Sequence, residues 1–222
     1  MGSPVFSSWA LTRFISGPVS NQMPSSFDVA IARFDEANAQ DPNLDQGQPR
    51  EWLYARRLTD WVKRLKPDAS ETLLLAARCQ HVRRWEIPRE TYPATRAGYL
   101  KWRADLKVFH SRIAGEILQQ SGFHPDTIRQ VQELNLKKNF PFDPNASVLE
   151  DALCLVFLQF QFADLAARSD DDKMINALRK SWLKMSPAGR SHALKLSYGP
   201  REQGLLARAL EPAPSSGRSS AP

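Results

Sequence analysis

Two imidazoles and one carboxylate stand out because the sequence places them in apolar helical segments. His81 lies near the end of the apolar run LLLAARCQHV, and His110 follows Phe109 in a long amphipathic pattern. Asp151 lies in VLEDALCLVFLQFQFADL, the most apolar segment of the chain, on the same helical face as Leu155. A carboxylate on such a face is unfavourable unless a cation, a metal ion or several hydrogen-bond donors meet it. These three side chains are therefore the first candidates for a site.

Neutral imidazoles and a carboxylate from different helices can together bind a divalent metal ion in a helical bundle. We therefore expect His81, His110 and Asp151 to hold Mn, Fe, Ni or Zn. Such a metal would acidify a water molecule and offset phosphate charge, as a phosphohydrolase requires. Glu150 and Glu51 are then the candidate catalytic residues. A second interpretation stays open, in which buried Asp–Arg or Asp–His pairs only join helices.

Positive charge is concentrated between residues 76 and 112, which carry nine Lys or Arg side chains against three acidic ones. The whole chain has a net charge of +6 and an isoelectric point near 9.5, which permits binding of phosphates, nucleotides or nucleic acid. Guanidinium groups can clamp phosphate oxygens, and aromatic rings beside them can stack on a base. The alternative is a solvated basic face. The candidate substrate-binding residues are Arg84, Arg89, Arg96, Tyr99, Arg103, Tyr54 and Gln80.

Helical periodicity must position these residues, because no alternating β pattern and no internal repeat is visible. We expect long helices at 26–39, 51–65, 96–120, 125–138 and 148–165, with an apolar helix before residue 82 and others after 170 and 187. The prediction is an all-α, single-domain helical bundle of about seven helices over residues 24–198. Residues 1–23 are expected to form a disordered leader and residues 199–222, rich in Pro, Ser, Gly and Arg, a disordered tail.

Composition limits the protein class. A chain of 222 residues with 42% hydrophobic residues suits one sizeable core. No apolar run reaches the length of a membrane span, about 18 residues, so we expect a soluble protein without a membrane partner. Cys79 and Cys154 form no CxxC pair, which argues against a cysteine zinc site and favours buried free thiols. We expect a cytoplasmic location, and the leader, which lacks acidic residues, leaves a mitochondrial one open.

Four segments, LYARRLTDWV, AARCQHVRRW, FHSRIAGEIL and LEDALCLVF, resemble the HD-domain metal phosphohydrolases in order and spacing. By this resemblance Tyr54 takes the place of the first His, and Gln80-His81 takes that of the family's His-Asp doublet. His110 falls where a further His often lies, and Asp151 where the last Asp lies. Two of the four defining ligands differ in type. The resemblance therefore implies a shared helical scaffold with an altered metal site.

A closer resemblance is to DUF4202, a family of unknown function, over residues 27–196. The phrases QHVRRWEIPRETYP, AGYLKWRADLKVFH, LEDALCLVFL and LRKSWLKMS carry it. This likeness implies little about chemistry. The function expected from the sequence is a metal-dependent hydrolase of a phosphorylated small molecule or nucleotide, with an HD-like helical site. The alternative is a non-catalytic module that binds a nucleotide or RNA in a basic cleft, and a purely structural role is the third hypothesis.

Overall fold

The computed structural model describes residues 23–211, so residues 1–22 and 212–222 lie outside the described residues, and with them nearly all of the predicted leader and half of the predicted tail. Most of the described chain is helical, and its two short strands form one hairpin, which confirms the all-α prediction. The helices are α1 (Ser26–Ala39), α2 (Arg50–Leu65), α3 (Glu71–Cys79), α4 (Arg96–Gln120), α5 (Pro125–Leu136), α6 (Pro144–Val156), α7 (Phe162–Ala167), α8 (Asp171–Lys184), α9 (Pro187–Ala193) and α10 (Pro200–Leu210). A π-helical turn, η3 (Phe157–Gln161), joins α6 to α7, so the described residues form nine helices when this continuous helix is counted once.

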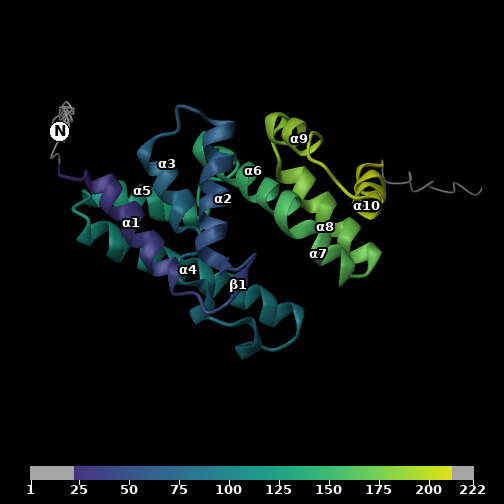
Figure 1. Ribbon diagram of the computed structural model, residues 1–222, viewed down its shortest axis with the longest axis horizontal. Helices are drawn as coiled ribbons and strands as arrows, with labels where there is room; N and C mark the ends of the chain where they lie inside the picture. Colours follow the sequence, from purple (N-terminus) through teal and green to yellow (C-terminus); the bar gives the residue numbers. More distant parts are fainter. Residues whose placement is uncertain (1–22, 212–222) are drawn as a thin grey trace, which may run out of the picture.

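The helix α6 lies between two groups of helices. Figure 1 shows α1 to α5 on one side of it and α7 to α10 on the other. On the first side α6 packs against α2, α3 and α5, and on the second against α8 and α9. One cluster of buried apolar side chains runs from Ala30 on α1 to Ala209 on α10 and connects the two groups. The helix predicted to be central is therefore central.

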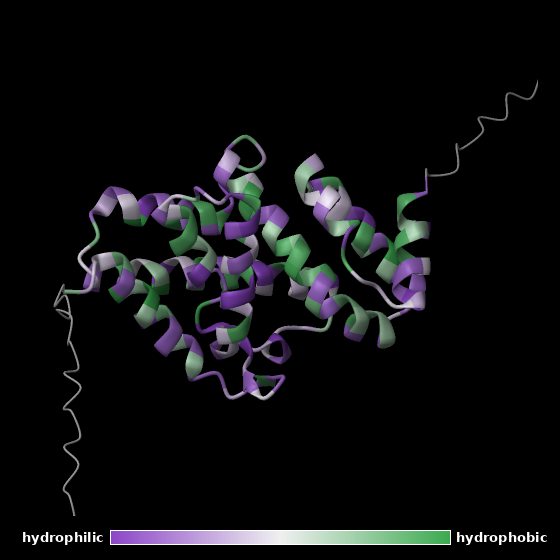
Figure 2. Cartoon of the chain, turned by 45° about the horizontal axis from the view of Figure 1, so that its top comes forward, coloured by the Kyte–Doolittle hydropathy of each residue, from purple (hydrophilic) through white to green (hydrophobic). Residues whose placement is uncertain are grey.

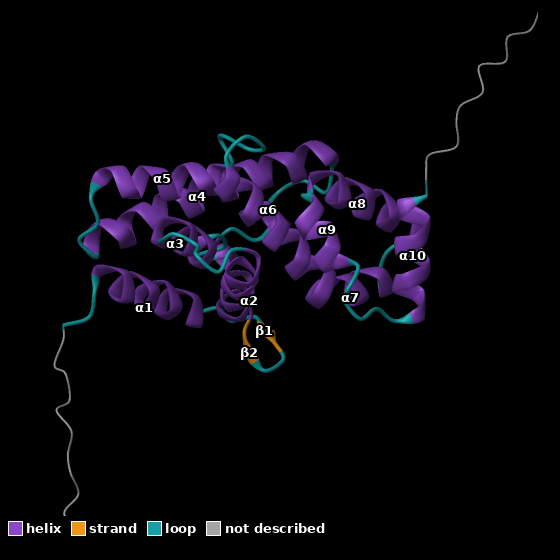
Figure 3. Cartoon of the chain, turned by 90° about the horizontal axis from the view of Figure 1, so that it is seen from above, coloured by secondary structure: helices purple, strands orange, loops and turns teal. Residues whose placement is uncertain are grey.

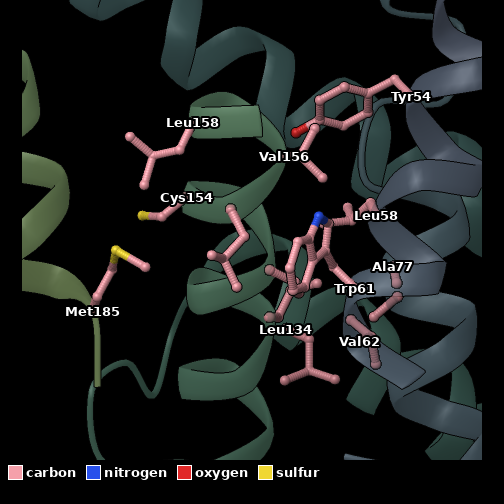
Figure 4. Packing of buried hydrophobic residues seen from close by; sticks show 14 of the residues in the cluster. Tyr54, Leu58, Trp61, Val62, Ala77, Leu134, Cys154, Val156, Leu158 and Met185 are labelled. Carbon is pink, nitrogen blue, oxygen red and sulfur yellow. The ribbon is translucent and has the colours of Figure 1, made fainter. Parts of the chain in front are cut away.

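The contact between α2 and α6 forms the middle of this core. Tyr54, Leu58 and Trp61 recur at spacings of four and three, so they lie on one face of α2 and point toward α6 (Figure 4). Val156 faces them from α6, while Cys154 turns toward α8 and its neighbour Met185. Figure 2 shows green, hydrophobic colouring on much of the α6–α7 helix, while the other helices carry both green and purple segments. Burial of these side chains fixes which face of α2 points inward.

The continuous helix Pro144–Ala167 is, by length and composition only, apolar enough to cross a membrane. The prediction that no apolar run reaches the length of a membrane span does not hold for this helix. It is the core helix of the bundle, however, and 56% of its most apolar window is buried inside the protein. Its hydrophobicity is thus accounted for by packing.

The C-terminal segment is ordered further than predicted. The disordered tail was expected to begin at residue 199, but α10 occupies Pro200–Leu210. Leu205, Leu206 and Ala209 are buried, with α10 packed against α7 and α8. The prediction was wrong because the flanking Pro, Ser and Gly residues hid an apolar stripe at helical spacing. The helical region therefore extends to Leu210.

A short β-hairpin with a two-residue turn directly precedes α2. The strands β1 (Leu44–Asp45) and β2 (Gln48–Pro49) pair antiparallel immediately before the first residue of α2 (Figure 3). A polar loop was expected there. Gln46 and Gly47 both have positive φ, at 52° and 74°, which the twist of a tight hairpin favours. This hairpin returns the chain to Arg50, so the first turn of α2 begins beside the buried Asp41.

Candidate functional site: a basic cavity around Glu51

A cavity of about 410 Å³ opens between α2, α4, α6 and α8, and it is lined by six cationic side chains against two carboxyl groups. The cationic residues are Arg50, Arg84, Arg103, Lys107, Lys137 and Lys184. The carboxyl groups belong to Glu51 and Glu150. Small-molecule sites have cavities of about 300–1,000 Å³. The cavity therefore has the size for a metabolite and the charge for an anion.

Glu51 is held at the first turn of α2 by its backbone. The residue before α2, Pro49, has no side chain that can cap the helix. Asp41 replaces that cap: its Oδ2 accepts the Glu51 N–H at 3.0 Å, and its Oδ1 accepts the Asn43 N–H at 2.9 Å. The Glu51 side chain then lies 7% exposed on the same helix face as Tyr54. Backbone hydrogen bonding thus orients the carboxyl group toward the cavity.

His81 meets Glu51 just after the end of α3. Its Nδ1 lies 3.3 Å from Glu51 Oε2, a contact that lacks hydrogen-bond alignment. The Tyr54 ring stacks on the imidazole, with centroids 4.2 Å apart and planes 11° from parallel. Arg84 approaches from the other side, its Nε 3.8 Å from Glu51 Oε1 and its guanidinium 3.4 Å from His81 Nε2. Glu51, His81 and Arg84 therefore form one polar group in the cavity wall, with Tyr54 stacked against it.

His110 lies deeper than His81. It is 3% exposed, and its ring centroid is 5.7 Å from that of His81. Its Nδ1 is 2.9 Å from the carbonyl oxygen of Val82, which can only accept a hydrogen bond. The ring proton therefore resides on Nδ1, and Nε2 presents a lone pair. Burial, together with the neighbouring His81, lowers the His110 pKa to about 3.

Burial also shifts the pKa values of Glu51 and His81. It raises the pKa of Glu51 to about 7, although the nearby Arg84 charge works in the opposite direction. Burial and the Arg84 charge lower the pKa of His81 well below its usual range. At neutral pH the cavity thus holds two uncharged imidazoles and a carboxyl group close to its own pKa. A group with such a pKa can both accept and donate a proton.

Glu150 holds two of the lysines. Lys137, the left-handed residue that ends α5 with φ 57°, forms an ion pair with it, and Lys184 Nζ lies 3.3 Å from its Oε1. Burial raises the pKa of Glu150, but the charges of Lys137 and Lys184 outweigh burial and lower it. Glu150 is therefore ionised and fixes both ammonium groups at the cavity. This arrangement suits a positioning role better than the acid–base role expected from the sequence.

Asp151 does not join the histidines. Its Oδ1 accepts the Ser186 N–H at 2.8 Å, its Oδ2 accepts the Ser186 hydroxyl, and the backbone of Gly189 packs against it. It thus anchors the first turn of α9 to α6. Within residues 23–211 no group of three or more His, Cys, Asp or Glu side chains is arranged to hold a metal ion. The expected ligand set of His81, His110 and Asp151 is not formed, because α6 directs Asp151 away from the cavity.

The remaining substrate-binding candidates divide into two sets. Tyr54, Gln80, Arg84 and Arg103 line the basic cavity as expected. Arg89 lines an adjoining cavity of about 400 Å³, where its guanidinium donates 2.9 Å hydrogen bonds to the carbonyls of Tyr92 and Pro93.

The last two candidates, Arg96 and Tyr99, line neither cavity. Both are exposed near the start of α4. Arg103, which lines the basic cavity, donates a 3.3 Å hydrogen bond to the Tyr99 hydroxyl. Of the nine cationic residues of the basic stretch, all of which the structure describes, Arg84, Arg103 and Lys107 line the basic cavity.

Several cavity residues were missed. On α4, Arg103, Lys107 and His110 follow one another at spacings of four and three, and this helical spacing could have revealed Lys107. Lys184 lies in the phrase LRKSWLKMS, which carried the family resemblance but supplied no candidate site residue. Lys137 gave no signal, because its place depends on where α5 stops.

Comparison with known proteins supports the resemblance to DUF4202 but not the resemblance to the HD-domain phosphohydrolases. No curated protein and no solved structure matches the chain. The family model described as "Domain of unknown function (DUF4202)" matches residues 28–206, which include every helix from α2 to α9 and all cavity residues. The chain therefore belongs to the DUF4202 family.

Proposed function

We propose that this protein binds a phosphorylated small molecule or nucleotide in the basic cavity and hydrolyses its phosphate ester with Glu51 as general base. The observation that carries the proposal is the charge of the cavity, in which six cationic side chains surround a buried carboxyl group. Guanidinium and ammonium groups are the side chains that bind phosphate oxygens most strongly. An anionic ligand is the partner that this cavity favours.

The lysines and arginines would bind the phosphate group and offset the charge that develops on it. Arg103 and Lys184 are exposed at the outer part of the cavity, and Glu150 fixes Lys184 and Lys137. In the reaction a water oxygen attacks phosphorus, its proton passes to Glu51, and the bond to the departing oxygen breaks. The departing oxygen then takes a proton from solvent. His81, in contact with Glu51, positions that carboxyl group.

A divalent metal of the kind expected from the sequence, Mn, Fe, Ni or Zn, would supply a more acidic water molecule and additional positive charge. His81 and His110 remain the candidate ligands at this cavity, but they and Glu51 do not form a complete ligand set within the described chain. The HD-like scaffold stays a prediction from sequence. No step above passes through a metal, and measurement of the metal content of the purified protein tests this part separately.

Binding without turnover is the second candidate function. It is favoured by the adjoining cavity, where Trp85 and Trp102 lie beside Arg84 and Arg89. The Arg84 guanidinium lies 4.8 Å from the centroid of the Trp102 ring. Rings and guanidinium groups of this kind contact bases in nucleotide and RNA complexes. A module that only binds nucleotide or RNA would use the same surfaces.

Calorimetric titration with adenosine 5′-monophosphate and with adenosine tests the binding step. The phosphorylated ligand should bind, and Arg103→Ala or Lys184→Ala should weaken its binding roughly tenfold or more, as expected for loss of one charge-assisted hydrogen bond. Lys63→Ala removes an exposed charge of α2 that does not line the cavity, so it serves as the matched control. Equal binding of nucleotide and nucleoside would contradict the proposal.

Phosphate release from a panel of nucleoside and sugar phosphates tests the reaction. Glu51→Gln should abolish release while retaining binding, because the amide cannot accept the proton of water. Binding by the unmodified protein with no release from any member of the panel would favour the non-catalytic module.

A further inference from the structure

Hydrogen-bond acceptors gather at the inner end of the basic cavity. Glu51 Oε2, Gln80 Oε1, His110 Nε2 and Asn135 Oδ1 belong to side chains that line it, and none of the four atoms has a hydrogen-bond partner within residues 23–211. These side chains are only 7%, 7%, 3% and 1% exposed, respectively. Buried polar atoms without partners are rare in folded proteins. Four of them around one cavity indicate that a bound molecule completes their hydrogen bonds.

For two of these atoms the acceptor character is fixed by contacts on the far side of the side chain. His110 Nδ1 carries the ring proton, because it faces the Val82 carbonyl oxygen at 2.9 Å, so Nε2 can only accept. The Asn135 amide nitrogen donates to Cys79 Sγ at 3.1 Å, which leaves its oxygen for the cavity. The four side chains come from α2, the end of α3, α4 and α5. Four separate elements thus place these side chains in the wall of one cavity.

The outer part of the cavity has the opposite chemistry. Arg50, Arg103 and Lys184 are exposed there, and Lys107 and Lys137 are half-buried. All five side chains carry only hydrogen-bond donors. A molecule that satisfies both regions has an anionic end, which faces the cations, and an uncharged end with several N–H or O–H donors. Inorganic phosphate meets the second requirement poorly, because at neutral pH it carries only one or two hydroxyl groups for the four inner acceptors.

We infer that the ligand is a phosphorylated polyhydroxy compound, whose hydroxyl groups donate to the inner acceptors while its phosphate contacts the outer lysines and arginines. This inference rests on the proposed function for the phosphate end and adds the chemistry of the other end. A free sugar phosphate and the ribose phosphate of a nucleotide share this chemistry. The 410 Å³ of the cavity lies in the range of sites for molecules of this size.

Two ligands of equal charge and similar length separate this inference from the proposed function. Ribose 5-phosphate and pentyl phosphate are both five-carbon monoesters, but only the first carries hydroxyl donors. Calorimetric titration of the full chain should show ribose 5-phosphate binding at least tenfold more tightly, about the change expected for one or two neutral hydrogen bonds. Equal affinities overturn the inference and leave phosphate binding intact. If neither phosphate binds, both the inference and the proposed function fail.

A second pair identifies the source of the hydroxyl groups. Adenosine 5′-monophosphate and its 2′,3′-dideoxy form differ only in the ribose hydroxyls. A preference for the hydroxylated nucleotide points to a nucleotide, whereas a preference for ribose 5-phosphate with no such difference points to a free sugar phosphate. Loss of the preference in both pairs contradicts the inference.

Removal of one acceptor should act on selectivity alone. Gln80→Met keeps the length of the side chain and removes its oxygen, so it should weaken ribose 5-phosphate binding several-fold and leave pentyl phosphate binding unchanged. Lys184→Ala should weaken both by the same factor. Gln130→Met, on the exposed face of α5, is the matched control. Gln80→Met and Asn135→Leu should each keep the circular dichroism spectrum of the unmodified protein. If both are folded and neither changes the preference for ribose 5-phosphate over pentyl phosphate, the inference is contradicted. The comparison of the two ligands on the unmodified chain does not depend on any variant.

Discussion

Replacement of Glu51 by Gln should stabilise the folded protein, and increasingly so as the pH rises. The carboxyl group titrates at about 4.5 when exposed and at about 7 in the cavity, because burial disfavours its charged form. Between these values the folded state holds a proton that the unfolded state has released. The protein is therefore least stable with respect to this group above pH 7, where Glu51 must be ionised inside the cavity. Its ionisation there lowers the free energy of unfolding. The difference between the two pKa values corresponds to a cost on the order of 3 kcal/mol.

Glutamine has the same shape and does not titrate. The free energy of unfolding of Glu51→Gln minus that of the unmodified protein should therefore rise by roughly 3 kcal/mol between pH 4.5 and pH 8, most of it between pH 5 and 7. Urea denaturation at half-unit steps of pH measures this difference. Comparison with the variant is essential, because the histidines act in the opposite direction. The lowered pKa values of His81 and His110 make the folded state lose stability as the pH falls below 6.5.

Glu71→Gln removes an exposed carboxyl group from the first turn of α3 and is the matched control, whose stability difference should not follow this curve. A difference for Glu51→Gln that is constant from pH 5 to pH 8 would refute the reasoning. It would mean that the carboxyl group is as well solvated, or as well paired, in the folded protein as in the unfolded chain.

Two further predictions concern stability away from the cavity. Asp151→Ala should lower the free energy of unfolding by about 1–3 kcal/mol in urea denaturation, since it leaves the Ser186 N–H without an acceptor, and Gly189→Ala should act in the same direction because its Cβ would lie 2.4 Å from Asp151 Oδ1. Lost metal without lost stability in Asp151→Ala would instead favour the ligand role first expected for it. A chain that ends at Tyr198 should be roughly 3–5 kcal/mol less stable than one that ends at Glu211, because α10 buries two leucines and an alanine, and equal melting temperatures of the two chains would contradict this packing.

The sequence predicted the site best where helices are amphipathic. On α2 the apolar stripe of Tyr54, Leu58 and Trp61 fixes the inward face, and Glu51, one turn before Tyr54, must then point into the protein. The same reasoning placed His110 on the inner face of α4. These residues, with His81, do meet at one cavity.

The prediction for Asp151 was wrong because the apolar pattern of α6 does not show which face of the helix points to the cavity. The α6 helix is apolar on nearly all sides, so periodicity could not decide between its two adjacent carboxylates. Neighbouring residues of an α-helix point about 100° apart, and it is Glu150 that faces the cavity while Asp151 faces α9. Only the packing of α8 and α9 on α6 settles this choice. Tertiary contacts of that kind cannot be read from a single helix.

The π-helical turn η3 has a consequence for the length of the chain. A helix with such a turn contains one residue more than an α-helix that joins the same two ends. Phe157 and Gln161, at the two ends of the turn, both line the cavity, and Trp61 donates a 2.9 Å hydrogen bond to Gln159 within it. Deletion of one residue within the turn would restore regular hydrogen bonding and leave the helix that follows in the same orientation. Phe162 would then stay in the core, so this wall of the cavity can lose one residue without displacing the helices that follow.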